Sequence, residues 1–455
     1  MTSFRRLFPF LLLAAVIAAL LFGPATPIVQ AAIIIGFAIL SWALGLFAEP
    51  VTSLVFFLLI VLFHVAKPEV VFSGFASAAW WLVFGGSITA VAVQTTGLGA
   101  RLADLLFRGV SGPYWRAVAA VAAAAVGLAF LMPSTNGRIL LLMPVVLAFA
   151  ERLGLAPGRP GYAGLVVTTA LASFMPPTTI LPANVPNSIL LGAAETIYGV
   201  KLTYGPYLLL HFPILGALKT VVLIWLVSRF FAEPRPLVRT ETRALGPMSR
   251  DERRLVLLLG GSLALYATDS LHGISPAWIS LGTGVLCLPP FLGIVTAKTF
   301  SERINFATLI YVAGILGLGA VAADSGLAKA VSGALLRHAP LAPGHGAANA
   351  AILSAIGAGL GLLTTVTGVP AVLTPLAGEF AQAAGLPLLS VLMLEVVVFS
   401  TAFLPYEAPP IMIGLQLGRV GVGGATKLCL ALAAITILVL LPLDYLWWRW
   451  LGYLP

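Results

Sequence analysis

The stretch Pro133-Ser134-Thr135-Asn136-Gly137-Arg138 interrupts an otherwise apolar part of the chain, and Pro144 stands ten residues after Ser134. A similar stretch, Thr365-Val366-Thr367, interrupts another apolar segment ten residues before Pro375. Backbone that unwinds inside a hydrocarbon layer is costly unless it lines a protein-walled cavity. Two such interruptions at matching places predict a membrane protein made of two related halves, with a binding site near the middle of the bilayer.

A second interruption follows each of these stretches further along the chain. In the first half it is Pro182-Ala183-Asn184-Val185-Pro186-Asn187, and in the second half it is Pro405-Tyr406-Glu407-Ala408-Pro409-Pro410. Both are rich in proline, which removes a backbone donor and ends a helix. Each half is therefore expected to contain a hairpin with a polar tip and, after it, a helix that is broken in the middle.

The composition excludes a soluble domain. The 455 residues are 60% hydrophobic and 9% charged, and the mean hydropathy is +1.05, so too little polar surface remains to face water. We predict an all-α polytopic membrane protein of about 11 transmembrane helices plus two re-entrant hairpins, arranged as two inverted repeats. The five histidines are scattered and no phosphate-binding glycine loop is present, so no enzyme activity and no cofactor is expected.

The basic charge is explained by topology. The net charge of +9 is spread along the chain, whereas a nucleic-acid footprint would cluster on one solvated domain. With a cytoplasmic N-terminus most Lys and Arg fall inside, as a multi-pass protein of the inner membrane requires. Arg138 and Lys219 fall in ambiguous places. The outer side receives Lys67, Lys201, Lys329, Arg337 and Arg449.

The two halves share landmarks at similar spacing. Gly97 and Gly326 are 229 residues apart, and Pro144 and Pro375 are 231 apart. The predicted boundaries are a first transmembrane helix at 1–26, a first repeat at 27–231, a basic cytoplasmic linker at 232–254 and a second repeat at 255–455. Within the repeats we expect re-entrant hairpins at about 113–150 and 346–384, and unwound helices near 176–187 and 405–411.

The hairpin tips offer groups that suit an anion. Helix N-termini present free N–H groups and partial positive charge, which favour carboxylate, sulfate or phosphate oxygens. Short hydroxyl and amide side chains would orient such an anion without adding charge. The candidate side chains are Ser134, Thr135, Asn136, Thr365 and Thr367.

The breaks offer groups that suit a cation. Freed carbonyls with Thr178, Asn184 and Asn187 are oxygen ligands for sodium. Glu395 and Glu407 would bind a cation or a proton, and Glu395 would equally serve as a buried structural partner. Arg138 either pairs with an anionic substrate or neutralises a glutamate, because an ionisable side chain inside a membrane is expensive.

Several further motifs carry a resemblance to a known family. They are Trp42-Ala43-Leu44 with Glu49-Pro50, Phe72-Ser73-Gly74-Phe75, Thr96-Gly97-Leu98-Gly99-Ala100-Arg101 and Pro442-Leu443-Asp444-Tyr445-Leu446-Trp447-Trp448-Arg449. With the two tips and the two breaks, they resemble the divalent anion/sodium symporter (dicarboxylate/sulfate permease) family of the ion transporter superfamily. The resemblance covers nearly the whole chain.

The resemblance implies a homodimeric elevator transporter that moves di- or tricarboxylates, or sulfate, with sodium ions at the tips and loops. The candidate substrate-binding residues are those of the two tips, Arg138 and Pro409. The candidate cation-binding residues are Ser134, Asn136, Asn184, Asn187, Thr365, Thr367, Glu407 and Ala408.

The chain departs from the family pattern mainly in the second half. Val366 stands where the family has asparagine, Ile411 replaces the loop asparagine, and Pro176-Pro177 replaces a Gly-Gly pair. Glu407 would shift coupling from sodium toward protons. Two alternatives remain: a cation/proton antiporter that uses Glu395 and Glu407, and a membrane sensor that keeps the fold without transport.

Overall fold

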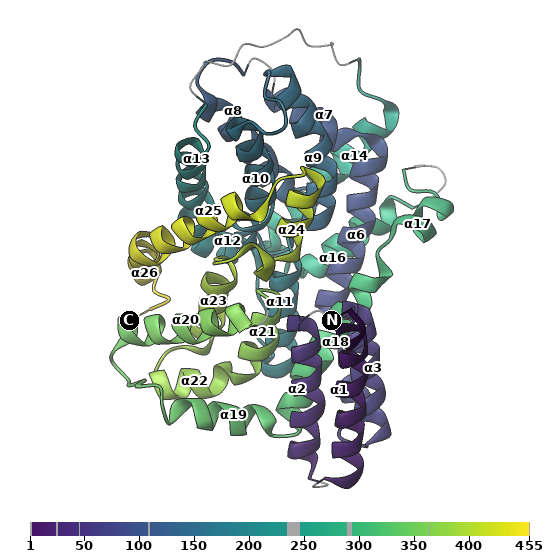
Figure 1. The fold of residues 1–455 in the computed structure, drawn as a ribbon, viewed down its shortest axis with the longest axis vertical. Coiled ribbons are helices and arrows are strands. Elements are labelled where there is room, and N and C mark those ends of the chain that lie inside the picture. Colours follow the sequence, from purple (N-terminus) through teal and green to yellow (C-terminus); the bar gives the residue numbers. More distant parts are fainter. Residues whose placement is uncertain are drawn as a thin grey trace.

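The computed structural model describes residues 2–23, 26–44, 46–107, 110–233, 246–288, 294–363 and 365–454. Within these ranges the chain is helical and contains no β-strand (Figure 1). Most of the predicted linker, residues 234–245, lies outside the described residues.

The first half runs from α1 to α13. Its helices are α1 (Thr2–Phe22), α2 (Pro27–Leu44), α3 (Glu49–Leu62), α4 (Pro68–Val71), α5 (Ser73–Ala76), α6 (Ala78–Thr96), α7 (Leu98–Phe107), α8 (Tyr114–Ala129), α9 (Thr135–Arg152), α10 (Pro160–Phe174), the 3₁₀ turn η1 (Pro176–Thr179), α11 (Val185–Tyr198), α12 (Tyr204–His211), the π-helical η2 (Phe212–Leu218) and α13 (Lys219–Phe230).

The second half runs from α14 to α26. Its helices are α14 (Arg250–Ala267), α15 (Asp269–His272), α16 (Pro276–Leu286), α17 (Ala297–Arg303), α18 (Phe306–Asp324), α19 (Leu327–Leu336), α20 (Gly346–Leu363), α21 (Gly368–Leu373), the 3₁₀ turn η3 (Thr374–Leu376), α22 (Ala377–Ala384), α23 (Leu388–Phe399), the 3₁₀ turn η4 (Pro405–Glu407), α24 (Pro409–Leu417), α25 (Val422–Ile435), the π-helical η5 (Thr436–Leu440) and α26 (Leu441–Trp450).

Four continuous helical stretches in the described residues are long and apolar enough to cross a membrane: Ala78–Thr96, Tyr204–Phe230, Phe306–Asp324 and Val422–Trp450. Eight shorter apolar helices accompany them. Large apolar side chains on outer helices, such as Leu257, Leu438 and Trp450, are exposed, as a lipid-facing surface requires. The protein is a polytopic all-α membrane protein, as predicted; the number of spans and the inverted repeat stay predictions.

Each half packs one of its helices against the other half. α16 of the second half packs against α6 of the first, and α3 of the first half packs against α18 of the second. Both contacts bring backbones close: a Cβ on Gly85 would lie 2.4 Å from the Ser280 carbonyl oxygen, and one on Gly314 would lie 2.4 Å from Ser53 Oγ. Small residues permit such close helix packing in membranes.

Matching glycines turn the chain into α7 and α19. Gly97 and Gly326 both have φ of +78°, the left-handed region that costs glycine nothing. α7 and α19 then lie toward opposite ends of the long axis (Figure 1).

The two hairpins differ in regularity. In the first, α8 and α9 flank the tip, and α9 continues through Pro144 to Arg152. In the second, α20 is followed by the short α21, and Pro375 falls within a 3₁₀ turn before α22 begins. Proline inside a helix removes one hydrogen bond and strains the preceding turn, and the second hairpin shows this as a loss of α-geometry.

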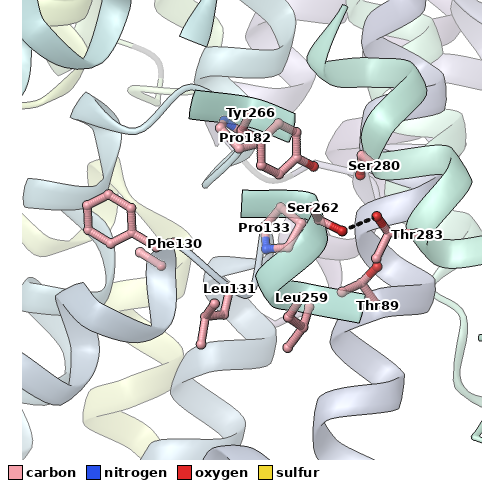
Figure 2. Close-up of a pocket in the computed structure, with 11 residues that line it drawn as sticks. Thr89, Phe130, Leu131, Pro133, Pro182, Leu259, Ser262, Tyr266, Ser280 and Thr283 are labelled. Atoms are coloured by element: carbon pink, nitrogen blue, oxygen red, sulfur yellow. Dashed lines mark hydrogen bonds between the residues drawn. The ribbon is translucent and has the colours of Figure 1, made fainter. Parts of the chain in front are cut away.

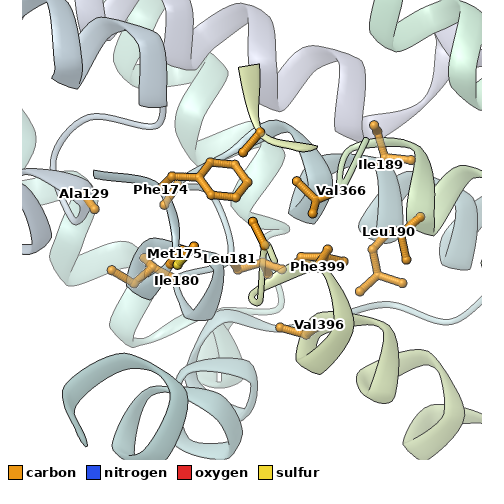
Figure 3. Packing of buried hydrophobic residues seen from close by; sticks show 14 of the residues in the cluster. Ala129, Phe174, Met175, Ile180, Leu181, Ile189, Leu190, Val366, Val396 and Phe399 are labelled. Atoms are coloured by element: carbon orange, nitrogen blue, oxygen red, sulfur yellow. The ribbon is translucent and has the colours of Figure 1, made fainter. Parts of the chain in front are cut away.

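The breaks of both halves share one apolar core. Phe174, Ile180 and Leu181 from the first break lie near Val366 and Phe399 of the second half (Figure 3). Each of these side chains is buried. The polar atoms of the breaks are therefore held in surroundings that exclude water, where an unpaired donor or acceptor is expensive.

Candidate functional site

The first hairpin tip is a capped helix N-terminus. Ser134 has extended backbone geometry, and its Oγ accepts a hydrogen bond from the Gly137 N–H at 3.1 Å. This is the usual N-cap arrangement, which pairs one of the free N–H groups of the helix. α9 therefore begins at Thr135 with its positive end at the tip.

The first break also ends in a capped helix N-terminus. The chain leaves α10 at Phe174, passes through η1, and enters α11 after Asn184, whose Oδ1 accepts from the Asn187 N–H at 3.3 Å. The Asn187 Nδ2 donates to the Ile180 carbonyl oxygen at 2.8 Å. Two helix N-termini, those of α9 and α11, are thus built into one half by Ser134 and Asn184.

Arg138 ties this tip to this break. It is fully buried, and its guanidinium donates to the carbonyl oxygens of Ala183 at 2.9 Å and Ser173 at 2.8 Å. It also donates to the Met132 carbonyl oxygen and to Thr135 Oγ1. These bonds use the two terminal nitrogens, whereas the buried Nε has no hydrogen-bond partner among the described residues, so a role in binding an anion stays a prediction.

Five buried polar atoms near the first tip and break have no hydrogen-bond partner among the described residues. They are Asn136 Oδ1, Arg138 Nε, Ser173 Oγ, Asn184 Nδ2 and Asn187 Oδ1. Buried polar atoms are nearly always paired, so unpaired ones call for an explanation such as an absent ion, water or ligand. The three oxygens suit a hard cation, and the amide donor suits an anion.

A water-sized cavity of about 20 Å³ borders the same region. Pro133 of the tip and Pro182 of the break line it, together with hydroxyls from α14 and α16 (Figure 2). The Ser262 and Thr283 hydroxyls lie 2.5 Å apart. The sequence motifs do not single out these hydroxyls, because isolated serines and threonines in apolar helices normally bond to their own backbone.

The second tip is organised differently. Thr367 has helical backbone geometry and forms no side-chain cap on α21. The Val366 N–H donates to the Glu407 carbonyl oxygen at 2.9 Å, which joins the tip directly to the second break. Thr365 lines a cavity of about 20 Å³ together with Trp42 and Tyr311. The second tip is thus closed by a backbone contact and faces aromatic rings.

The second break uses its acidic side chain as a cap. Glu407 is buried, and its Oε1 accepts from the Leu404 N–H at 2.7 Å. Ala408 precedes α24 without any side-chain cap, and Pro409 opens that helix. Glu395 lies apart, on α23, where its Oε2 accepts from Thr374 Oγ1 at 2.8 Å. The structure therefore brings Glu407, and not Glu395, to the second tip.

One known protein family matches this chain over nearly its whole length. A family model described as the sodium:sulfate symporter transmembrane region matches residues 5–454. The chain belongs to the sodium:sulfate symporter family. This family membership confirms the resemblance predicted from the tips, breaks and flanking motifs.

Relatives of this sodium:sulfate symporter family member include transporters. A membrane protein of Cupriavidus necator is 26% identical over 84% of this chain and 76% of its own length. The L-tartrate/succinate antiporter of Escherichia coli K12 is 23% identical over 59% of this chain and 58% of its own length. The chain spans about half to three fifths of the length of such antiporters that it matches.

A solved structure shows the same fold. The YdaH transporter of Alcanivorax borkumensis superposes with a TM-score of 0.55, and the match covers 84% of this chain and 87% of that one. At 17% identity the likeness speaks for the fold alone.

Proposed function

We propose that this protein is a secondary active transporter of small anions of the di- or tricarboxylate or sulfate class. The observation that carries the proposal is the first tip and break, where Arg138 joins two capped helix N-termini. Such N-termini favour anionic oxygens, and the unpaired Asn184 Nδ2 supplies a further donor. The family and its relatives are transporters, and no enzyme activity is proposed.

Dicarboxylates are the preferred substrates among these classes. The antiporter relatives are named for tartrate and succinate. Both are dianions whose two carboxylates would suit two helix N-termini in one site. Cation coupling through sodium or protons, a homodimer and an elevator motion are part of the proposal.

The proposed orientation has the N-terminus inside, in the inner membrane. The excess of Lys and Arg on one side supports it. Two sets of contacts support the inverted repeat: α9 packs against α24, and α11 packs against α21. Because these contacts pair hairpins with broken helices across the halves, they are what a pseudo-two-fold axis would produce.

The decisive test is flux in proteoliposomes. Vesicles loaded with unlabelled succinate would receive labelled succinate, tartrate, citrate or sulfate, with sodium, potassium or proton gradients imposed separately. Uptake that needs a sodium or proton gradient supports symport, and uptake that needs internal succinate supports exchange. If no anion moved under any gradient and none raised the melting temperature, the proposal would be abandoned.

A further inference from the structure

Lys219 is a buried basic side chain outside the first tip and break. Among the Lys and Arg side chains that the structure describes, Arg138 and Lys219 alone are buried. Lys219 opens α13 within the apolar stretch Tyr204–Phe230. A charge at such a place is expensive and marks a functional site by default.

The Lys219 ammonium sits at the carbonyl end of the second broken helix. Its Nζ donates to the Ser400 carbonyl oxygen at 2.7 Å and to Thr401 Oγ1 at 2.9 Å. Ser400 is the C-cap residue directly after α23, just before the chain unwinds toward η4. The C-terminal end of a helix carries partial negative charge, and such half-helix ends bind coupling cations in transporters.

Two further buried side chains lie in the same region, Asp444 on α26 and Cys429 on α25. Asp444 Oδ1 has no hydrogen-bond partner among the described residues. Asp444 and Thr401 also line a cavity of about 550 Å³ between α20, α23 and α26. The Ser400 carbonyl oxygen and the hydroxyls of Ser400 and Thr401 thus converge on the Lys219 ammonium.

Two positions of the second tip and break carry apolar side chains, which leaves the hydroxyls of Thr365 and Thr367 and the buried Glu395 carboxylate as oxygen ligands among the described residues. Val366 and Ala408 stand at its tip and break, and the Glu407 carboxylate accepts from the Leu404 N–H. The first half has no lysine in the equivalent place: the end of α10 is bonded by Arg138, which comes from its own hairpin.

We propose that the Lys219 ammonium is a tethered cation that occupies the ion position at the broken end of α23, so that the second half binds no free sodium. The π-helical turn η2 directly before Lys219 sets the rotation at which the side chain enters the site, and π-turns recur at functional sites. The inference rests on the proposed function for its role in transport.

The test replaces the tethered cation by a free one. Lys219→Ala removes the ammonium and opens space, whereas Lys219→Met removes the charge and fills the space. In sodium-free buffer we expect anion uptake by both variants to fall by about tenfold or more, because a loss of about 1.4 kcal/mol is tenfold. Sodium or methylammonium should restore K219A and leave K219M inactive. The exposed Lys201→Ala is the matched control.

A binding readout separates this inference from the proposed function. Sodium should raise the melting temperature of K219A by more than it raises that of the wild type or K219M, whether or not any anion is transported. Wild-type uptake by K219A without sodium, or no sodium effect on its uptake and melting, would overturn the inference. If K219A does not fold, Thr401→Val replaces it: uptake should fall severalfold with the melting temperature retained, and unchanged uptake would overturn the inference.

Discussion

The two hairpin tips border cavities of similar size that differ in their hydroxyl groups. The first cavity is lined by the hydroxyls of Thr89, Ser262 and Thr283 among apolar and aromatic side chains, whereas the second has the Thr365 hydroxyl beside the rings of Trp42 and Tyr311. Among the described residues, the first tip and break retain five unpaired buried polar atoms, while the second tip is joined to its break by the Val366 backbone. This contrast indicates separate roles for the two tips: unpaired polar atoms gather at the first, whereas the second is closed by a backbone hydrogen bond.

The largest effect is expected from Arg138→Met. The change leaves the carbonyl oxygens of Met132, Ala183 and Ser173 without their donor, at about 1–3 kcal/mol for each unpaired group. We expect the melting temperature to fall more than for Lys219→Met, because Lys219 bonds fewer backbone oxygens. The exposed Arg116→Met is the control. Equal melting temperatures for R138M and R116M would contradict this expectation.

The next effect separates the two tips by transport. Asn136→Ala removes an oxygen that has no hydrogen-bond partner among the described residues, so the melting temperature should hold while uptake falls about tenfold, or about 1.4 kcal/mol. Thr367→Ala in the second tip should change uptake much less, since its side chain caps nothing. Initial rates in proteoliposomes measure both, and equal losses would contradict the division between the tips.

A smaller effect is expected from Glu407. Glu407→Gln keeps an oxygen that accepts from the Leu404 N–H, so stability and uptake should stay near wild type. Glu407→Ala should cost about 1 kcal/mol, the value of a helix cap. Thermal melts and uptake with and without a proton gradient test this pair. Loss of proton-driven uptake in a well-folded E407Q would instead make Glu407 the proton carrier.

The smallest effect concerns the region beside the linker. Arg101 donates to Glu252 at 2.7 Å, and this bond holds the pKa of Glu252 below its usual value of 4.5. A lowered pKa stabilises the fold above the unfolded value, and this contribution is lost as pH falls through the folded value. Glu252→Gln should therefore lower stability by about 1 kcal/mol or less at pH 7, and the difference should vanish in acid.

The control for that pair is Asp251→Asn. Asp251 forms an exposed ion pair with Arg254 at 3.3 Å, and solvent screens such pairs. Melting curves of both variants from pH 7 to about pH 2 measure the effect, because the stabilisation is lost only as pH falls from 4.5 through the lower folded value. A constant difference between E252Q and wild type across that range would show that the Arg101 contact does not depend on the charge of Glu252.

Local signals in the sequence predict the all-α membrane fold and the family. Proline and asparagine mark helix ends through backbone chemistry that acts over a few residues, so the sequence alone marks Ser134 and Asn184 as special positions, and both prove to be helix caps. The partners of Arg138 are not predicted in this way. They are the backbone carbonyl oxygens of Ser173 and Ala183, which every residue type carries and which therefore leave no signal in the sequence.

The contacts of Lys219 are another feature that the sequence does not predict. The sequence leaves its place in the membrane ambiguous, since its partners Ser400 and Thr401 lie 181 and 182 residues away. A single lysine within the apolar stretch Tyr204–Phe230 is the available signal. The hydroxyls of Ser262 and Thr283 have no comparable signal, because their meaning depends on α14 and α16 meeting the first tip.

The packing of α3 and α16 against the opposite halves bears on how the protein is made. α3 leaves the ribosome long before α18, the helix against which it packs so closely at Ser53 and Gly314. Until α18 has been inserted, the face of α3 that packs against Gly314 is covered by lipid or by an insertion factor. Neither half can reach its final packing before the other has been inserted, so assembly of this protein is a late event of biogenesis.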